Sequence, residues 1–208
     1  MTLRDMISDG DAGIDEIAAH LDGLSPEARK QEVFELGRAG QRTLFERAAG
    51  SAPITFEHFV PPSVEAAQEV SHSGKNTLPL PKAFKYFEKR FTRPDDGSPR
   101  LFGYNEGVSR PLIGPGYFVA VPTAGESEWE QRGPIVVDYY QVPEREARVP
   151  EQWPRVVPNS RGLQFFVYRH TRDFMRRVSE HVSIGAAFKG EKALDHYFVL
   201  VRDPQADN

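Results

Sequence analysis

The spacing of hydrophobic residues changes along the chain, and the first part of it predicts helices. Apolar side chains recur at i, i+3, i+4 and i+7 in Ile14, Ile17, Ala18 and Leu21, which is typical of an amphipathic helix. Ser25 followed by Pro26 predicts a second helix start, because serine caps a helix and proline suits its first position. Residues 1–50 are therefore expected to form a helical layer.

After residue 100 the pattern predicts strands, because β-branched and aromatic residues become dense. We expect strands at residues 100–105, 116–122, 134–142, 182–187 and 195–202. Short connections between the first three favour an antiparallel meander. A loop that contains Gly190 suits a hairpin between the last two.

An apolar stripe predicts the longest helix over residues 159–180, because Leu163, Phe174 and Val178 fall on one helical face. The proline-rich residues 142–158 before it should be extended. The predicted order is β-β-β-α-β-β after the N-terminal helices. This order predicts the α+β class, with a mainly antiparallel sheet of about five strands and one long helix packed on it.

The middle of the chain is harder to interpret. Residues 82–92 have phenylalanines at helical spacing, whereas Phe84 and Tyr86 also fit the alternation of a strand. We favour a helix, because Pro81 stands where a helix could begin.

The chain is expected to form one globular domain of three parts. They are an acidic helical layer at 1–50, an irregular or helical connection with a basic-aromatic segment at 51–99, and the sheet with its long helix at 100–204.

Composition removes several kinds of chemistry. The 208 residues include no cysteine, so disulfides, thiolate metal sites and cysteine nucleophiles are excluded. No apolar run reaches the roughly 18 residues of a membrane span, and the absence of cysteine suits a reducing compartment. We therefore expect a cytoplasmic protein without membrane contact.

Charge argues against nucleic acid as a partner. The net charge is −4, and residues 1–50 alone carry an acidic excess of that size. Residues 75–100 interleave lysine and arginine with aromatic side chains, which would suit a single strand. Aromatic residues at helical spacing more often belong to a core, so nucleic-acid binding is disfavoured.

One candidate site lies between two expected strands, within residues 101–117. There Tyr104, Asn105, Glu106 and Arg110 stand among glycines, which allow close approach to a ligand. Arginine could anchor a carboxylate or phosphate. The alternative is a structured turn in which Glu106 pairs with Arg110.

Other polar residues stand in apolar surroundings. Asp138 and Tyr140 share one face of an expected strand, which lies either towards solvent or in a pocket. His170 lies on the stripe of the expected long helix, as a core residue or as an acid or base. No histidine pair has a metal-ligand spacing, so no metal site is expected.

These residues support three hypotheses of function. The first is a small-molecule-binding sensor or carrier with an aromatic pocket between sheet and helix; its ligand-binding residues would be Tyr104, Asn105, Arg110 and Tyr140. The second is a metal-independent acid/base enzyme; its catalytic candidates would be Glu106, Asp138 and His170. The third is an interaction or assembly module, with a homodimer formed through the N-terminal helices. No motif identifies a cofactor or the ligand.

Overall fold

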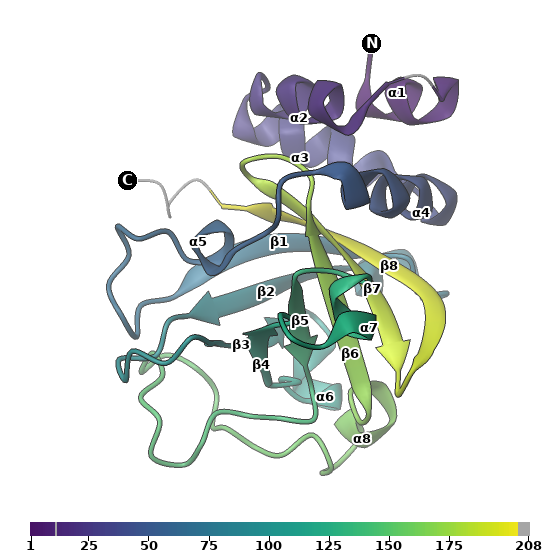
Figure 1. Ribbon diagram of the computed structural model, residues 1–208. Coiled ribbons are helices and arrows are strands. Elements are labelled where there is room, and N and C mark those ends of the chain that lie inside the picture. Colours follow the sequence, from purple (N-terminus) through teal and green to yellow (C-terminus); the bar gives the residue numbers. More distant parts are fainter. Residues whose placement is uncertain (11, 204–208) are drawn as a thin grey trace.

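Eight antiparallel strands close into a barrel in the computed structural model of the chain, which describes residues 1–10 and 12–203, with residue 166 described by its backbone alone (Figure 1). The strands are β1 (Val70–Asn76), β2 (Tyr86–Thr92), β3 (Leu101–Glu106), β4 (Phe118–Pro122), β5 (Ile135–Asp138), β6 (Thr171–Arg177), β7 (Val182–Lys189) and β8 (Lys192–Arg202). Each strand pairs with its neighbour in sequence, and β1 pairs with β8 to complete the ring. Residues 11 and 204 of the expected segments lie outside the described residues.

The expected α+β fold with an open sheet of about five strands and one long helix is therefore wrong. Strands β3, β4, β5, β7 and β8 overlap the ranges that the sequence predicted, but β5 ends at Asp138, well before residue 142. Strand β1 was not foreseen. Strand β6 occupies most of the second half of the expected helix 159–180, and β2 occupies most of the expected helix 82–92.

Both misassigned strands contain a charged residue at an inward-facing position. Along β2, Lys89 is buried on the same face as its apolar neighbours Phe87 and Phe91. Along β6, the buried Asp173 shares a face with Met175. An inward charge interrupts the apolar alternation that marks a strand, so the remaining apolar residues fitted a helical period instead.

Four helices form a layer outside the barrel, at the top of Figure 1. They are α1 (Leu3–Asp9), α2 (Ile14–Asp22), α3 (Pro26–Glu35) and α4 (Arg38–Arg47). The Ser25 hydroxyl accepts a hydrogen bond from the amide of Ala28 at 3.3 Å, which caps α3 as the sequence predicted. Apolar side chains of the layer pack against outward residues of β7 and β8, such as Ile184 and Val199.

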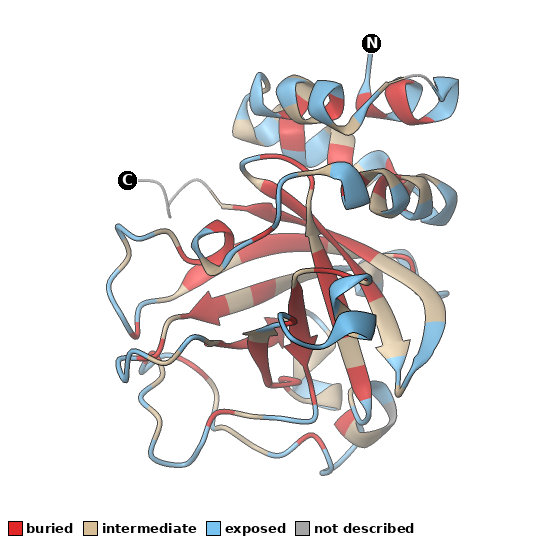
Figure 2. Cartoon of the chain, in the orientation of Figure 1, coloured by how far each residue is buried: buried red, intermediate tan, exposed pale blue. Residues whose placement is uncertain are grey.

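The barrel interior is filled by side chains, and Figure 2 shows the strands largely buried. Strand glycines permit this packing. A Cβ atom added to Gly185 would lie 2.2 Å from the Phe198 ring, and one added to Gly103 would lie 2.3 Å from the Phe118 ring. Each phenylalanine ring thus lies directly over a glycine of the neighbouring strand, where a larger residue would clash with the ring.

Short helices and loops cover the two ends of the barrel. The lower end in Figure 1 carries α6 (Arg110–Ile113) and α8 (Gln164–Val167), and the upper end carries α5 (Phe56–Phe59). The remaining short elements are η1 (Ala48–Gly50), η2 (Lys82–Lys85) and α7 (Ser127–Glu130). Among the described helices, none combines the length and apolar character that a bilayer crossing requires.

Candidate functional site

Four polar side chains meet inside the lower half of the barrel, and we call them the interior polar cluster. They are Lys89 on β2, Asn105 on β3, Tyr139 directly after β5, and Asp173 on β6. Residues that pair in register point to the same face of a sheet. Lys89 pairs with Asn105, and both point inward. Asp173 pairs with the inward Val137, two residues before Tyr139. All four are buried; strands hold Lys89, Asn105 and Asp173, and Tyr139 is the first residue after β5.

Lys89 is the centre of the cluster and is only 1% exposed. Its Nζ atom donates to Asn105 Oδ1 at 3.1 Å, to Asp173 Oδ2 at 3.2 Å, and to the Tyr139 hydroxyl. The amide nitrogen of Asn105 donates in turn to the Tyr139 hydroxyl and to the Gly116 carbonyl, both at 3.1 Å. Three acceptors therefore surround an ammonium group that has three donors.

Aromatic rings enclose the same ammonium group. Its Nζ atom lies 4.9 Å from the ring centroids of Phe118, Tyr139 and Phe198, and 5.9 Å from that of Phe87. Ring faces attract a cation by their quadrupole, more strongly where water is excluded. The cluster is thus a polar centre inside an apolar cage.

Burial drives the titration of the cluster towards its neutral forms. It lowers the pKa of Lys89, and Asp173 opposes that shift. It raises the pKa of Asp173, which Lys89 opposes, and it raises the pKa of Tyr139 well above its usual value. In each of these two residues, the charge of the partner opposes the effect of burial.

The lower end of the barrel closes over the cluster. The Tyr168 ring, just after α8, stacks on Tyr139 with centroids 5.1 Å apart and an angle of 21°. A Cβ atom at Gly116, whose φ is +55°, would lie 2.4 Å from the Tyr168 ring. Gln164 of α8 accepts a hydrogen bond from the amide of Gly116 at 3.3 Å. The glycine that the sequence placed in a candidate site therefore allows Tyr168 to seal the interior.

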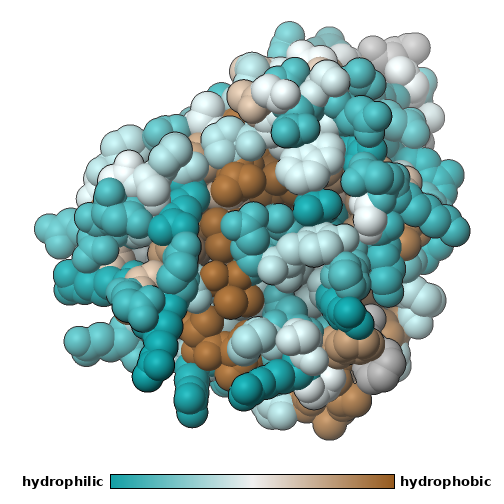
Figure 3. Space-filling view, turned by 60° about the horizontal axis from the view of Figure 1, so that its bottom comes forward, coloured by the Kyte–Doolittle hydropathy of each residue, from teal (hydrophilic) through white to brown (hydrophobic). Residues whose placement is uncertain are grey.

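The surface of this closure is partly apolar. Side chains exposed by 40% or more lie in and beside the two short helices: Val108 and Leu112 near α6, and Leu163 and Val167 near α8. The space-filling view from this side shows apolar patches set among polar atoms (Figure 3). Among the residues of α6 and α8 whose side chains the structure describes, no apolar one is buried, which is typical of segments that can move.

The site candidates that the sequence singled out at the end of β3 lie on different faces of the sheet. Asn105 belongs to the interior polar cluster. Tyr104 points to the opposite face, where it is buried against Tyr117 at 5.5 Å and Trp153 at 5.0 Å. The proline-rich segment 142–158 covers this outer face and places Trp153 inward. Alternation along one strand thus separates two neighbours that were expected to bind one ligand.

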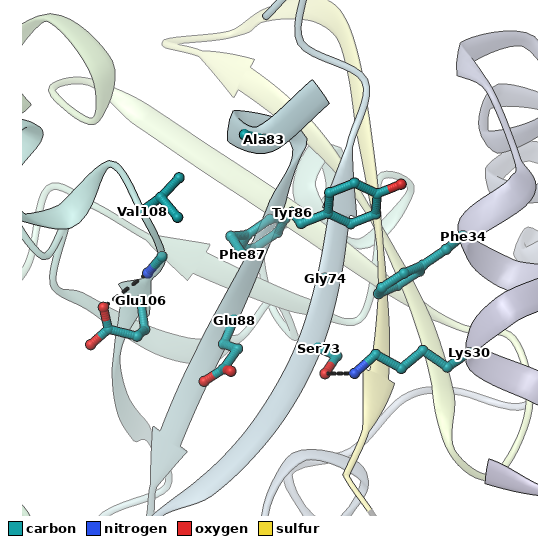
Figure 4. A pocket seen from close by; sticks show the side chains of 11 residues that line it. Lys30, Phe34, Ser73, Gly74, Ala83, Tyr86, Phe87, Glu88, Glu106 and Val108 are labelled. Carbon is teal, nitrogen blue, oxygen red and sulfur yellow. Dashed lines mark hydrogen bonds between the residues drawn. The ribbon is translucent and has the colours of Figure 1, made fainter. Parts of the chain in front are cut away.

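Glu106 lies on the outer face, beside a groove of about 350 Å³ between α3 and strands β1 and β2 (Figure 4). Its Oε1 atom accepts a hydrogen bond from Arg110 Nε at 2.7 Å, the pairing that the sequence left as an alternative. Glu88 stands opposite in register and is 2.9 Å from Arg90. Each carboxylate of this groove is therefore balanced by its own arginine.

Asp138, Tyr140 and His170 lie together on the outer face of the barrel near the lower end, where Asp138 is buried and the other two are exposed. Asp138 accepts a hydrogen bond from the Tyr140 amide at 3.0 Å and lies 3.4 Å from Arg172 Nε. The Tyr140 and His170 rings are 5.0 Å apart. Among the described residues, no hydrogen bond joins Glu106, Asp138 or His170 to one another. The structure thus groups two of the catalytic candidates and separates Glu106 from them.

Sequence reasoning did not single out Lys89, Tyr139 or Asp173 as site candidates. Had residues 86–92 been assigned as a strand, Lys89 would have shared its inward face with Phe87 and Phe91. A charged residue on that apolar face was the signal that the sequence offered. Within residues 1–10 and 12–203, no group of three or more histidine, aspartate or glutamate side chains is placed to hold a metal ion. No family model, curated protein or solved structure matches this chain.

Proposed function

We propose that the barrel binds a small, mostly apolar molecule at the interior polar cluster. The ligand would have an aromatic or unsaturated body and one carbonyl or carboxyl oxygen. The observation that carries this proposal is the position of Lys89, a 1% exposed ammonium group held between three polar partners and four aromatic rings. Small-molecule sites usually combine apolar walls with a few convergent polar groups.

The chemistry of the cluster supports such a ligand. Lys89 and Tyr139 can donate hydrogen bonds to an oxygen atom, while Asp173 balances the charge of the lysine. Rings of Phe87, Phe118 and Phe198 would contact the apolar body. Asn105, which the sequence suggested as a ligand-binding residue, would orient the polar end.

Entry would take place at the lower end of the barrel. The interior is filled by side chains, so the ligand must displace one of them, and Tyr168 on the end of α8 is the side chain that seals the cluster. Outward movement of α8 and Tyr168 would free the space over Tyr139. The exposed Leu163 and Val167 would favour an apolar ligand at this entrance.

A second candidate function is catalysis in which Lys89 acts as an amine nucleophile and Asp173 as its acid; it is favoured by the 3.2 Å contact between them and by burial, which lowers the pKa of Lys89 and raises that of Asp173. A neutral lysine amine attacks a carbonyl carbon, and a neighbouring acid can donate the proton that leaves with water. Reductive trapping with benzaldehyde and cyanoborohydride, followed by peptide mass mapping, tests this function. Modification confined to exposed lysines would reject it.

Ligand binding can be tested with a thermal-shift screen of aromatic and unsaturated carboxylic acids, aldehydes and ketones. A ligand at one hundred times its Kd stabilises the folded state by about 2.7 kcal/mol. We expect at least one class to raise Tm in a concentration-dependent way. The double variant Lys89→Met/Asp173→Leu removes both charges together and should remain folded, but it should lose the response.

The matched control is Lys192→Met, which removes an exposed lysine at the start of β8. It should respond as the unchanged protein does. An unchanged response in the folded double variant would place the ligand elsewhere and overturn the proposal. The absence of any response across the screen would overturn it as well.

A further inference from the structure

The segments that cover the two ends of the barrel differ in charge. Residues 51–69, which include α5 at the upper end, contain three glutamates and no lysine or arginine. The helical layer at the top of Figure 1, residues 1–50, has ten acidic side chains against six basic ones. At the lower end, residues 152–172 contain four arginines and no acidic residue, and residues 107–117 contain one arginine and no acidic residue. The molecule is therefore acidic above and cationic below.

The cationic lower end also exposes apolar side chains, which we call the lower-end patch: Val108, Leu112, Leu163 and Val167. Each of them is between 40% and 71% exposed. The short helices beside them are in contact, because a Cβ atom added to Gly114 at the end of α6 would lie 2.8 Å from Gln164 Oε1 of α8. Two loops that are distant in the chain thus form one apolar surface, on the side that Figure 3 shows.

Exposed cations border the lower-end patch on two sides. Arg161 precedes α8 and Arg169 follows it, and both are exposed. Lys82 on η2 is also exposed, and η2 borders the patch because Ala83 and Val108 line the same groove (Figure 4). No ion pair between described residues includes Arg161, Arg169 or Lys82. These three cations are therefore available to a negatively charged partner.

Acidic side chains beside the same end already pair with arginines. Glu106 lies 2.7 Å from Arg110, and Glu191, in the turn between β7 and β8, lies 2.8 Å from Arg132. A carboxylate that has its own arginine adds little negative potential around it. The lower end thus keeps a positive potential around its apolar patch.

An anionic lipid surface complements this arrangement. Apolar side chains of a surface-bound protein insert at the boundary between headgroups and acyl chains, while lysine and arginine attract anionic headgroups. A second copy of the chain fits less well, because a symmetric contact would bring the same cationic side chains together. The sequence predicted no membrane contact because it has no run long enough to span a bilayer, but binding at a surface needs no such run.

We propose that the lower end of the barrel docks on a membrane surface that contains anionic lipids, through the lower-end patch and the cations beside it. The acidic upper end would face away from the lipid, which orients the molecule as it approaches. Tyr168, which seals the interior polar cluster, directly follows α8. Docking would therefore place the ligand entrance against the lipid, and this role rests on the proposed ligand binding, whereas docking itself does not.

Co-sedimentation with lipid vesicles tests the proposal in the absence of any ligand. We expect binding to vesicles of phosphatidylcholine with phosphatidylserine, and binding weaker by roughly tenfold or more to vesicles of phosphatidylcholine alone. High salt should weaken binding to the anionic vesicles, because it screens exposed charges. Failure to bind the anionic vesicles would overturn the proposal, and so would equal binding to the two kinds of vesicle.

The double variant Arg161→Gln/Arg169→Gln tests the cations. It should weaken binding to the anionic vesicles by roughly tenfold or more, because each basic side chain near such a surface strengthens binding about fivefold. The matched control Arg4→Gln/Arg145→Gln removes two exposed arginines, one from α1 and one from the segment that covers β3 and β4, and it should bind as the unchanged protein does. Equal binding of the two double variants would contradict docking through the lower end.

The apolar side chains are tested by Leu112→Ser/Leu163→Ser, which changes two exposed positions and should also weaken binding by roughly tenfold or more. Sedimentation velocity without vesicles tests the other occupant. A dimer that this variant dissociates, together with no vesicle binding, would assign the patch to a second copy and overturn the proposal. Lys89→Met/Asp173→Leu should bind vesicles normally while it lacks the thermal-shift response, so docking and ligand binding can fail separately.

Discussion

The two ends of the barrel both hold charged side chains on inward-facing positions, but they balance the charge in different ways. At the lower end, the buried Lys89 has the buried Asp173 as its partner at 3.2 Å. At the upper end, Arg177 donates to the Ser179 carbonyl at 3.2 Å, and the buried His58 ring has an Nε2 atom without a hydrogen-bond partner. The lower end pairs its charges internally, whereas the upper end leaves one buried ring nitrogen unsatisfied.

The two ends therefore differ in whether a ligand would have to displace existing polar contacts. A balanced pair is stable without a ligand, and a ligand must compete with contacts that already exist. At the upper end, the Nε2 atom of His58 has no hydrogen-bond partner, so a new partner there would not compete with an existing contact.

The largest expected effect comes from breaking the pair at the lower end. Lys89→Met leaves Asp173 buried without its partner and should lower the free energy of unfolding by about 3–5 kcal/mol. Adding Asp173→Leu should restore most of that loss, because both charges are then absent. Urea denaturation measures each value. If Lys89→Met were as stable as the control Lys192→Met, Lys89 and Asp173 would not form a buried pair in which each needs the other.

The apolar middle of the barrel, between the two ends, gives the next effect. Gly185→Ala would place a Cβ atom 2.2 Å from the Phe198 ring, and overpacking of this kind costs about 1–3 kcal/mol. Gly37→Ala, at a position with open space, is the control and should change stability far less. Equal unfolding midpoints for the two variants would contradict the close packing across β7 and β8.

At the upper end, the titration of His58 should make the free energy of unfolding depend on pH. Burial holds the pKa of folded His58 well below 6.5. Below pH 6.5 the unfolded chain therefore binds a proton that the folded protein does not, and the free energy of unfolding falls as pH falls. His58→Gln should flatten this slope, as measured by urea denaturation between pH 5 and 7. An unchanged slope would mean that His58 takes up its proton in the folded protein.

The smallest effect is expected on the outer surface, where neither end is involved. Arg110→Ala breaks the partly exposed pair with Glu106 and should change the free energy of unfolding by less than about 1 kcal/mol. It should also leave the thermal-shift response at the interior polar cluster intact. A lost response would assign Arg110 to ligand binding, the role that its position in the sequence suggested.

The sequence predicted the helical layer and the places of five strands, because these segments keep a regular apolar period. It did not predict closure, because the charged residues at the centres of β2 and β6 interrupt that period. Val70–Asn76 was missed for a related reason, since its inward positions include His72 and Gly74. The residues that obscured the fold are thus among those that now define its two ends.

Asn105 was the one ligand-binding candidate that the structure brings into the interior polar cluster. Asn105 contacts Lys89 of β2 and Tyr139 after β5, and Lys89 in turn contacts Asp173 of β6, 84 residues away in the chain. The spacing of residues within one segment cannot predict these contacts, because the contacts depend on the register of several strand pairs.

The pairing of β1 with β8, which seals the barrel, has a consequence during protein synthesis. Lys75 pairs with Val199, so the ring cannot close until nearly all of the described chain has left the ribosome. Until then β1 has an unpaired edge, and such edges promote association with other chains. Contacts between residues so distant in sequence also slow folding. The nascent chain is therefore expected to depend on chaperones until its last strand emerges.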